Sequence, residues 1–158
     1  MIENLKEIGI DHIGLIVPDR DKTITKFHEV LNIKEFKKYI FKPNKAWSNG
    51  KLIEKYELKI GMTLDNKMKG CNIEIIEPLI KDGIHREFLE LGCNGIHHIA
   101  YKVENYDYWL NKFKKKNSKF IFEAETEDEI NGYRRCFYAE DKILGTVYEI
   151  LEKPYFRK

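Results

Sequence analysis

The sequence contains two related stretches, Ile10-Asp11-His12-Ile13-Gly14-Leu15-Ile16-Val17 and, later, Ile96-His97-His98-Ile99-Ala100-Tyr101-Lys102-Val103. Each is a short apolar run with an imidazole near its start. Such self-similarity indicates an internal duplication. Two copies of one unit that each offer a histidine also suggest a metal site shared between the halves. When residue 12 is placed on residue 98, further identical pairs align without a gap: 13 with 99, 17 with 103, 21 with 107, 26 with 112 and 27 with 113.

Length and composition define the broad class of the protein. A chain of 158 residues suits one ordinary domain, or two small modules that share a core. The net charge of +2 gives no strong field for nucleic acid or for an anionic membrane. No apolar run approaches the roughly 20 residues needed to cross a bilayer. The segment 1–7 lacks the apolar core of a signal peptide, so a cytoplasmic protein is expected. Three cysteines without CxxC spacing, Cys71, Cys93 and Cys136, are expected to be reduced thiols.

The first copy is predicted to fold in the order β-α-β-β-β. Residues 10–17 are β-rich and are bounded by Pro18-Asp19. Asp19 or Asp21 can cap a helix over about 20–31, where apolar residues recur at helical spacing. Further strands are expected at 34–42, 53–62 and 71–77, with a loop at 43–52 and a polar turn at 65–70.

The second copy repeats this order after a short linker helix within 79–94. We expect a strand at 96–103, a helix over about 105–116, and strands at 118–123, 133–139 and 145–152. The acidic stretch Glu123 to Glu129 is expected to be a solvated loop. The predicted fold class is α+β, with two tandem βαβββ modules that form a cup-shaped mixed sheet around a metal site. Module one is 10–79, the linker is 80–94 and module two is 95–152, within a single domain over 10–152.

Strand parity indicates which side chains face the inside of this cup. Alternate residues of a strand point to opposite faces. In 10–17 the bulky residues share a face with Asp11 and should pack on the helix, so His12 faces the open side. In 96–103 the same reasoning points His98 into the cup and His97 away from it.

The last strands of the two copies also match each other, as Ile73-Glu74-Ile75-Ile76-Glu77 and Tyr148-Glu149-Ile150-Leu151-Glu152. A glutamate between large apolar residues is costly to bury unless a cation neutralises it. Each copy therefore offers one histidine on its first strand and one glutamate on its last. Two imidazoles with two carboxylates suit Zn, Ni, Co, Mn or Fe(II) and leave coordination positions for water or substrate.

Each of these residues also has an ordinary structural interpretation. A single strand histidine is more often a core or surface residue than a metal ligand. A strand glutamate usually lies on the solvated face of an antiparallel sheet, and this interpretation suits Glu152 and Glu77. The paired recurrence favours the metal site. His28 and His85 lie on predicted helices and are interpreted as structural or surface residues.

The pattern resembles the vicinal oxygen chelate superfamily, the glyoxalase/bleomycin-resistance group, over about 10–152. The closest local resemblance is to the methylmalonyl-CoA epimerases. It is carried by Ile10-Asp11-His12-Ile13-Gly14, by Ile73-Glu74-Ile75-Ile76-Glu77-Pro78-Leu79, and by Phe88-Leu89-Glu90 through Gly95-Ile96-His97-His98-Ile99-Ala100. The resemblance implies a divalent metal ion (Zn, Ni, Co or Mn), and its ligands carry over to His12, Glu74, His98 and Glu149.

The resemblance also implies the chemistry. It indicates a metal-dependent epimerase or lyase that works through a metal-stabilised enolate, with Glu149 and Glu57 as candidate catalytic bases. Glu54 competes with Glu57 for this role. Arg134, Arg135 and Tyr138 could hold an anionic or carbonyl group, although parity allows at most one of the two arginines to point inward.

Other functions remain open at this point. One alternative is a glyoxalase I-like lactoylglutathione lyase or a resistance-type enzyme, and another is a non-catalytic small-molecule-binding protein. The segment 137–146 departs from the His-Pro-Lys segment and paired glycines of the epimerases, which leaves an acyl-CoA as only one candidate substrate. The resemblance further implies a homodimer that acts on a small molecule.

Overall fold

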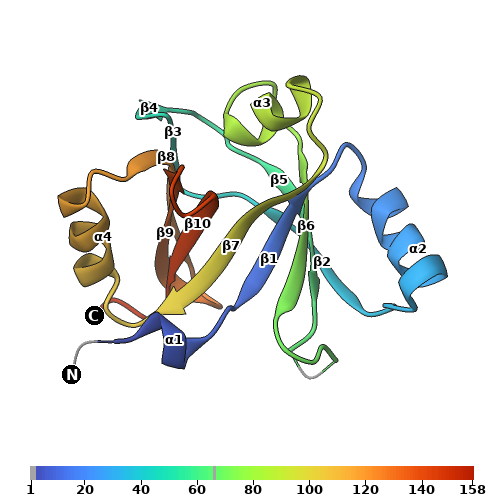
Figure 1. Cartoon of the computed structure of the whole chain (residues 1–158), viewed down its shortest axis with the longest axis horizontal. Coiled ribbons are helices and arrows are strands. Elements are labelled where there is room, and N and C mark those ends of the chain that lie inside the picture. The colour runs from blue at the N-terminus through green and yellow to red at the C-terminus, as the bar shows by residue number, and fades with distance from the viewer. Residues whose placement is uncertain (1–2, 66) are drawn as a thin grey trace.

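The computed structural model describes residues 3–65 and 67–158. Within them, ten strands form one sheet in the spatial order β2-β5-β6-β1-β7-β10-β9-β8-β3-β4, which curls into a half-barrel (Figure 1). The strands are β1 (His12–Ile16), β2 (Phe36–Phe41), β3 (Lys45–Ser48), β4 (Lys51–Leu52), β5 (Leu58–Thr63), β6 (Asn72–Pro78), β7 (Gly95–Val103), β8 (Lys119–Asp128), β9 (Gly132–Asp141) and β10 (Thr146–Glu152). The helices are α1 (Leu5–Ile8), α2 (Arg20–Leu31), α3 (Ile84–Glu90) and α4 (Tyr106–Lys115).

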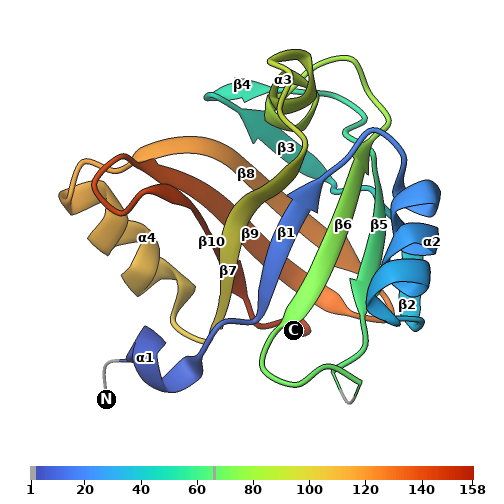
Figure 2. The same cartoon turned by 45° about the vertical axis from the view of Figure 1, so that its right-hand side comes forward.

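The centre of the sheet brings the two copies together. Strand β1 pairs in parallel with β6 and antiparallel with β7, and β7 pairs in parallel with β10. The first strands of both copies therefore lie side by side, and each is flanked by the last strand of its own copy. Figure 2 shows β6, β1 and β7 next to one another in the middle of the sheet. This arrangement confirms the predicted cup of two βαβββ modules.

The two longer helices cover the outer face of the sheet, one on each copy. Helix α2 begins at its N-cap Asp19, whose side chain accepts a hydrogen bond from the backbone N–H of Lys22, as predicted. Ile24 of α2 packs with Val17 and Ile75 in one core cluster. Trp109 of α4 packs in a second cluster that includes Phe137. Because both helices lie outside, as Figure 1 shows, they leave the concave face to side chains of the sheet.

The third core cluster fills the inside of the half-barrel. It joins Ile16, Ile76 and Phe122 from the inner face with Ile84 of the linker helix α3. Helix α3 is shorter than the predicted 79–94, and it closes one end of the cup near β3 and β4 (Figure 2). None of the helices in the described ranges is long and apolar enough to span a membrane.

Two loop predictions are wrong. The segment 43–52 contains the strands β3 and β4, and β3 pairs with β8 of the other copy. The acidic stretch 123–129 continues strand β8 as far as Asp128. In that stretch Ala124 is buried opposite Ala46 of β3, whereas its glutamate neighbours are more exposed. The stretch therefore alternates between buried and exposed residues as a strand does, but its acidic composition indicated a loop.

Other boundaries shift by a few residues. The strand predicted at 53–62 begins only at Leu58, and the strand predicted at 133–139 extends over Gly132–Asp141. The predicted lead-in contains the short helix α1. Residues 1, 2 and 66, which belong to the predicted lead-in and to the turn at 65–70, lie outside the described residues.

Candidate metal centre

Four adjacent strands bring the four predicted ligands to one point on the inner face. Gly14 of β1 lies opposite both Glu74 of β6 and His98 of β7. His12 and Glu149 lie opposite the same residue, Ala100. One ligand atom from each of His12, Glu74, His98 and Glu149 lies within 4.8 Å of the others. The cluster can therefore hold a metal ion.

The donor atoms are close enough to share one ion. Nε2 of His12 lies 2.8 Å from Oε2 of Glu74 and 3.1 Å from Oε2 of Glu149. Nε2 of His98 lies 3.6 Å and 3.1 Å from the same two oxygens. Bonds from Zn²⁺ to nitrogen or oxygen are about 2 Å long, so two ligands of one ion lie about 3 Å apart. The observed spacing fits that separation.

The cluster is buried, and no lysine or arginine of the described residues neutralises its two carboxylates. His98 is fully buried, Glu149 is 4% exposed and Glu74 is 9% exposed. Among the described residues no lysine or arginine pairs with either carboxylate; their ion pairs are all with the two imidazoles. A buried carboxylate without a cation is unfavourable. A bound cation would therefore stabilise the two buried carboxylates.

Glu152 shows how this chain neutralises a buried strand glutamate without a metal. Its side chain is 7% exposed and receives two hydrogen bonds from Arg135, at 2.8 Å and 2.7 Å. The expectation that Glu152 lies on a solvated face is therefore wrong. Glu77 accepts a hydrogen bond from the backbone of Arg20 and pairs with Lys59. The carboxylates of Glu74 and Glu149 differ, because within residues 3–65 and 67–158 their ion pairs are with histidines only.

When no metal is bound, protons on the two histidines supply the positive charge that neutralises Glu74 and Glu149. Burial alone would lower the pKa of His12, but the charge of Glu74 and the hydrogen bonds that the imidazole donates to neighbouring carboxylates raise it well above its ordinary value of 6.5. Burial alone would raise the pKa of Glu74, but the charge and hydrogen bond of His12 lower it below 4.5. Burial alone would raise the pKa of Glu149, but the hydrogen bond with His12 and the positive charge of both histidines lower it. A divalent cation can replace these protons.

The Nε2 atom of His98 is a second feature of the cluster that suits a bound ion. This atom is buried and has no hydrogen-bond partner among the described residues, although Oε2 of Glu149 is 3.1 Å away. A buried nitrogen without a partner is uncommon in folded proteins. Metal coordination would satisfy it, and together with the spacing this shows that the donor set fits a divalent ion.

A bulge in β7 changes the surroundings of His98. Gly14 pairs with His98, but the next residue, Leu15, pairs with Ile96, so His97 is an extra residue in the strand. Its Nδ1 lies 3.2 Å from Nδ1 of His98. The prediction that His97 points away from the cup is therefore wrong, because strand parity fails at a bulge.

A buried polar network lies behind the cluster and was missed at the sequence level. The ring of Tyr138 packs at a tilt against His98 with a centroid distance of 4.6 Å. His85 of α3 is fully buried, and its Nδ1 lies 2.6 Å from the hydroxyl of Tyr56. Burial and the neighbouring charge of His98 lower the pKa of His97 to about 3, so this imidazole is neutral. The signal that could have located the network is the histidine on the apolar face of the linker helix.

Glu57 is not part of the cluster. It lies before β5, is partly exposed, and its carboxylate pairs with Lys42 at 3.3 Å. The residue of β5 directly opposite Glu74 is Met62. Glu54 also lies in the turn before β5.

The side chains of the two candidate arginines have different partners, in agreement with the parity prediction that at most one of them points inward. Arg135 turns to the outer face, where its guanidinium pairs with Asp107 and lies over the ring of Tyr106. Arg134 pairs with Asp128 at 2.9 Å at the end of the β8–β9 hairpin.

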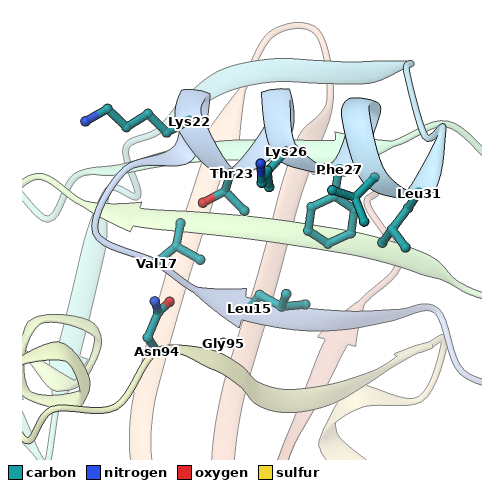
Figure 3. A pocket seen from close by; sticks show the side chains of 10 residues that line it. Leu15, Val17, Lys22, Thr23, Lys26, Phe27, Leu31, Asn94 and Gly95 are labelled. Atoms are coloured by element: carbon teal, nitrogen blue, oxygen red, sulfur yellow. The ribbon is translucent and has the colours of Figure 1, made fainter.

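A separate pocket lies on the outer face. Figure 3 shows Phe27 and Leu31 of α2 above Leu15 of β1, with Asn94 and Gly95 on the other side. These side chains line a pocket of about 490 Å³. Leu15 and Val17 have the opposite strand parity to His12, so this pocket does not open on the metal cluster.

The sheet and the buried donor set define a cup-shaped protein with a candidate metal centre. The family model described as the Glyoxalase/Bleomycin resistance protein/Dioxygenase superfamily matches residues 11–137. The chain belongs to this superfamily. A search of curated proteins found no match.

Solved structures of the same fold include several methylmalonyl-CoA epimerases. The enzyme of Streptomyces coelicolor, in complex with 2-nitronate-propionyl-CoA, is 16% identical over 93% of this chain and 98% of that chain, with a TM-score of 0.64. The enzyme of Mycobacterium tuberculosis is 19% identical over 93% of this chain and 88% of that chain, with a TM-score of 0.58. A third epimerase, in complex with methylmalonyl-CoA and NH4+, is 19% identical over 92% and 94%, with a TM-score of 0.64. At these identities the likeness establishes the fold.

Proposed function

We propose that the chain is a metal-dependent isomerase or lyase that removes a proton from a carbon next to a carbonyl group. The leading candidate reaction is epimerisation of an acyl-CoA of the methylmalonyl-CoA type. The observation that carries this proposal is the buried set of two imidazoles and two carboxylates, which has no arginine or lysine partner in the part of the chain that the structure describes. His12, Glu74, His98 and Glu149 would hold Zn, Ni, Co or Mn.

Metal and base have separate tasks in this proposal. The bound divalent cation supplies positive charge, which makes a carbon acid easier to deprotonate. Glu149 is the candidate base, because its carboxylate is part of the cluster and can accept a proton in its ionised form. The aromatic ring of Tyr138, which packs against His98, and the other buried apolar residues of the inner face exclude water from the proton transfer.

The structural neighbours support a CoA thioester as substrate. Their complexes contain 2-nitronate-propionyl-CoA and methylmalonyl-CoA. A homodimer, expected from the resemblance, is part of the same proposal, and light scattering of the purified protein would test it.

A second candidate is a lyase or isomerase that uses a single base. Epimerisation needs a proton-transferring group on each face of the planar intermediate. The side chain opposite Glu74 on β5 is Met62, and Glu57 pairs with Lys42 instead. This observation favours glyoxalase-like or resistance-type chemistry, which one carboxylate can perform. A binding protein without catalysis is less compatible with a buried donor set that suits a metal.

Two measurements test the proposal. Elemental analysis of protein purified without added metal should give one divalent ion per chain, and absence of any bound or bindable metal would contradict the proposal. The metal-loaded protein should then be incubated with methylmalonyl-CoA in D₂O. Deuterium at the α-carbon with inversion supports the epimerase, and metal binding without exchange removes this substrate in favour of the second candidate. Glu149→Gln should abolish exchange and retain the fold.

A further inference from the structure

We propose that Asp11 and His97 are positioning residues, which hold His12 and His98 with their Nε2 atoms turned toward the metal. The inference rests on the proposed function, because it assumes that the four-residue cluster binds a divalent ion. Its new content is that the two imidazole ligands are held by different chemical groups. One is oriented by a carboxylate and the other by a neutral imidazole.

Asp11 orients His12. Oδ2 of Asp11 lies 2.8 Å from Nδ1 of His12, while Nε2 of the same ring faces the two glutamates. An ionised carboxylate only accepts hydrogen bonds, so Nδ1 of His12 must carry the proton. In a neutral imidazole this leaves the lone pair on Nε2, where a metal ion needs it.

The position of Asp11 is itself fixed on several sides. Its backbone N–H donates to the carbonyl of Ala100 at 2.8 Å, and its carbonyl accepts from the N–H of Asn72 at 3.0 Å. Its second carboxylate oxygen, Oδ1, pairs with Lys102 at 3.2 Å. Asp11 is therefore held between β6 and β7 at the start of β1, and its Oδ2 has a defined place beside His12.

His97 takes the corresponding position behind His98. The bulge in β7 sets the two rings together, with Nδ1 to Nδ1 at 3.2 Å. If Nε2 of His98 is to bind a metal, Nδ1 of His98 must carry the proton and donate it to this contact. Nδ1 of His97 must then be the acceptor, so the proton of His97 lies on its Nε2. The ring of His97 packs edge-on against Phe88 of α3 at a centroid distance of 5.0 Å, which holds the acceptor in place.

Asp11 and His97 should differ in how much each contributes to metal affinity. A carboxylate acceptor makes the ligating imidazole a stronger donor to the metal than a neutral imidazole does, because it carries a full negative charge. Loss of the partner of a metal-binding histidine typically costs about 10–100-fold in metal affinity. Removal of Asp11 should therefore fall near the upper end of this range and removal of His97 near the lower end.

The test is Zn²⁺ affinity, measured by competition with a chromophoric chelator on the full chain. Asp11→Ala and His97→Leu should weaken Zn²⁺ binding by about 10–100-fold. His97→Gln, which keeps a side-chain acceptor, should recover most of the affinity lost in His97→Leu. Lys59→Met is the matched control, because it removes the lysine partner of Glu77, a carboxylate outside the cluster; its affinity should stay close to that of wild type.

A second readout needs no substitution and so does not depend on how the variants fold. In the Zn²⁺-loaded wild-type protein, ¹⁵N chemical shifts of the imidazole rings should show a proton on Nδ1 of His12 and of His98, and on Nε2 of His97. The opposite assignment for either ligand would overturn the proposal, as would unchanged Zn²⁺ affinity in both Asp11→Ala and His97→Leu. Wild-type protein that binds no Zn²⁺ would remove the proposed function as well, whereas tight wild-type binding with unaffected variants would remove this inference alone.

Discussion

Gly14 lies directly against the imidazole of His98. A Cβ atom built on Gly14 would lie 2.1 Å from Cε1 and 2.2 Å from Nε2 of that ring, far inside van der Waals contact. Gly14 does not have a positive φ, so the close approach of the ring, and not backbone conformation, requires glycine here. The absence of a side chain on β1 thus creates the space for a ligand of β7.

We expect Gly14→Ala to displace His98 and to weaken metal binding by more than about tenfold, since a ligand and not only its support is moved. Zn²⁺ competition titrations measure this effect. Gly61→Ala is the matched control, because a Cβ there meets Ile24 of α2 at 2.7 Å, away from the cluster. That variant should lose stability and keep its metal affinity. Equal affinities in Gly14→Ala and wild type would show that His98 is not a ligand.

Metal binding should stabilise the folded chain. An ion that binds only the folded state at a free concentration of 100 times its Kd contributes about 2.7 kcal/mol. For a domain of this size that raises the midpoint of thermal unfolding by about 5–10 °C. Differential scanning fluorimetry with ZnCl₂ and with EDTA measures the shift. Glu149→Gln should reduce the shift. If the midpoint of the wild-type protein is the same with ZnCl₂ as with EDTA, the assigned ligand set is contradicted.

The metal-free and metal-loaded proteins should depend on pH differently. The raised pKa of His12 means that its stabilising contribution is complete below about pH 6.5 and is lost as pH rises through the higher folded-state value. The lowered pKa of Glu74 means that its contribution is complete above about pH 4.5 and is lost on acidification. The site in metal-free protein is therefore most stable between these two values.

Because metal binding displaces a proton from His12, the affinity for Zn²⁺ should increase as pH rises from 5 to 8. Calorimetric titrations in two buffers of different ionisation enthalpy give the number of protons released. Binding without proton release near pH 6 would contradict the assignment of His12.

Glu57→Gln tests whether a base acts from the turn before β5. The carboxylate of Glu57 pairs with Lys42 and lies outside the cluster, so this substitution should leave metal affinity unchanged and proton exchange within about twofold of wild type. Glu149→Gln provides the contrast in the same exchange assay. Loss of exchange with intact metal binding in Glu57→Gln would restore Glu57 as a catalytic residue.

Arg135→Ala tests the buried pair on the outer face. It leaves Glu152, which is 7% exposed, without its cation, and should lower the free energy of unfolding by about 3 kcal/mol. Urea denaturation measures this change. Arg134→Ala, whose partner Asp128 is more exposed, should have a much smaller effect on the free energy of unfolding.

The sequence predicted the centre of the molecule well because duplication supplied independent evidence. His12 and His98 align in the two copies, as do Glu74 and Glu149; strand parity then placed both histidines inside the cup, and the structure brings all four residues together. The helix at Arg20–Leu31 was correct to the residue because an N-cap, an apolar repeat and a β-rich neighbour agreed.

The errors arose where the pattern of the chain is irregular. Parity misplaced His97 because a bulge adds one residue to a strand and is not visible in composition. The catalytic role of Glu57 stays a prediction: β5 begins after this residue, and Met62 is the residue of β5 opposite Glu74. Register between strands, which spacing along the chain does not fix, decides such neighbours.

The pairing of β3 with β8 has a consequence for the chain as a whole. A hairpin from the first copy completes the sheet of the second, where it covers backbone groups that would otherwise form an open edge. The two copies are thus interlocked, and a chain severed within the linker should yield fragments that refold only when mixed. An ancestor made of a single repeat would have needed a sister molecule to finish its own barrel.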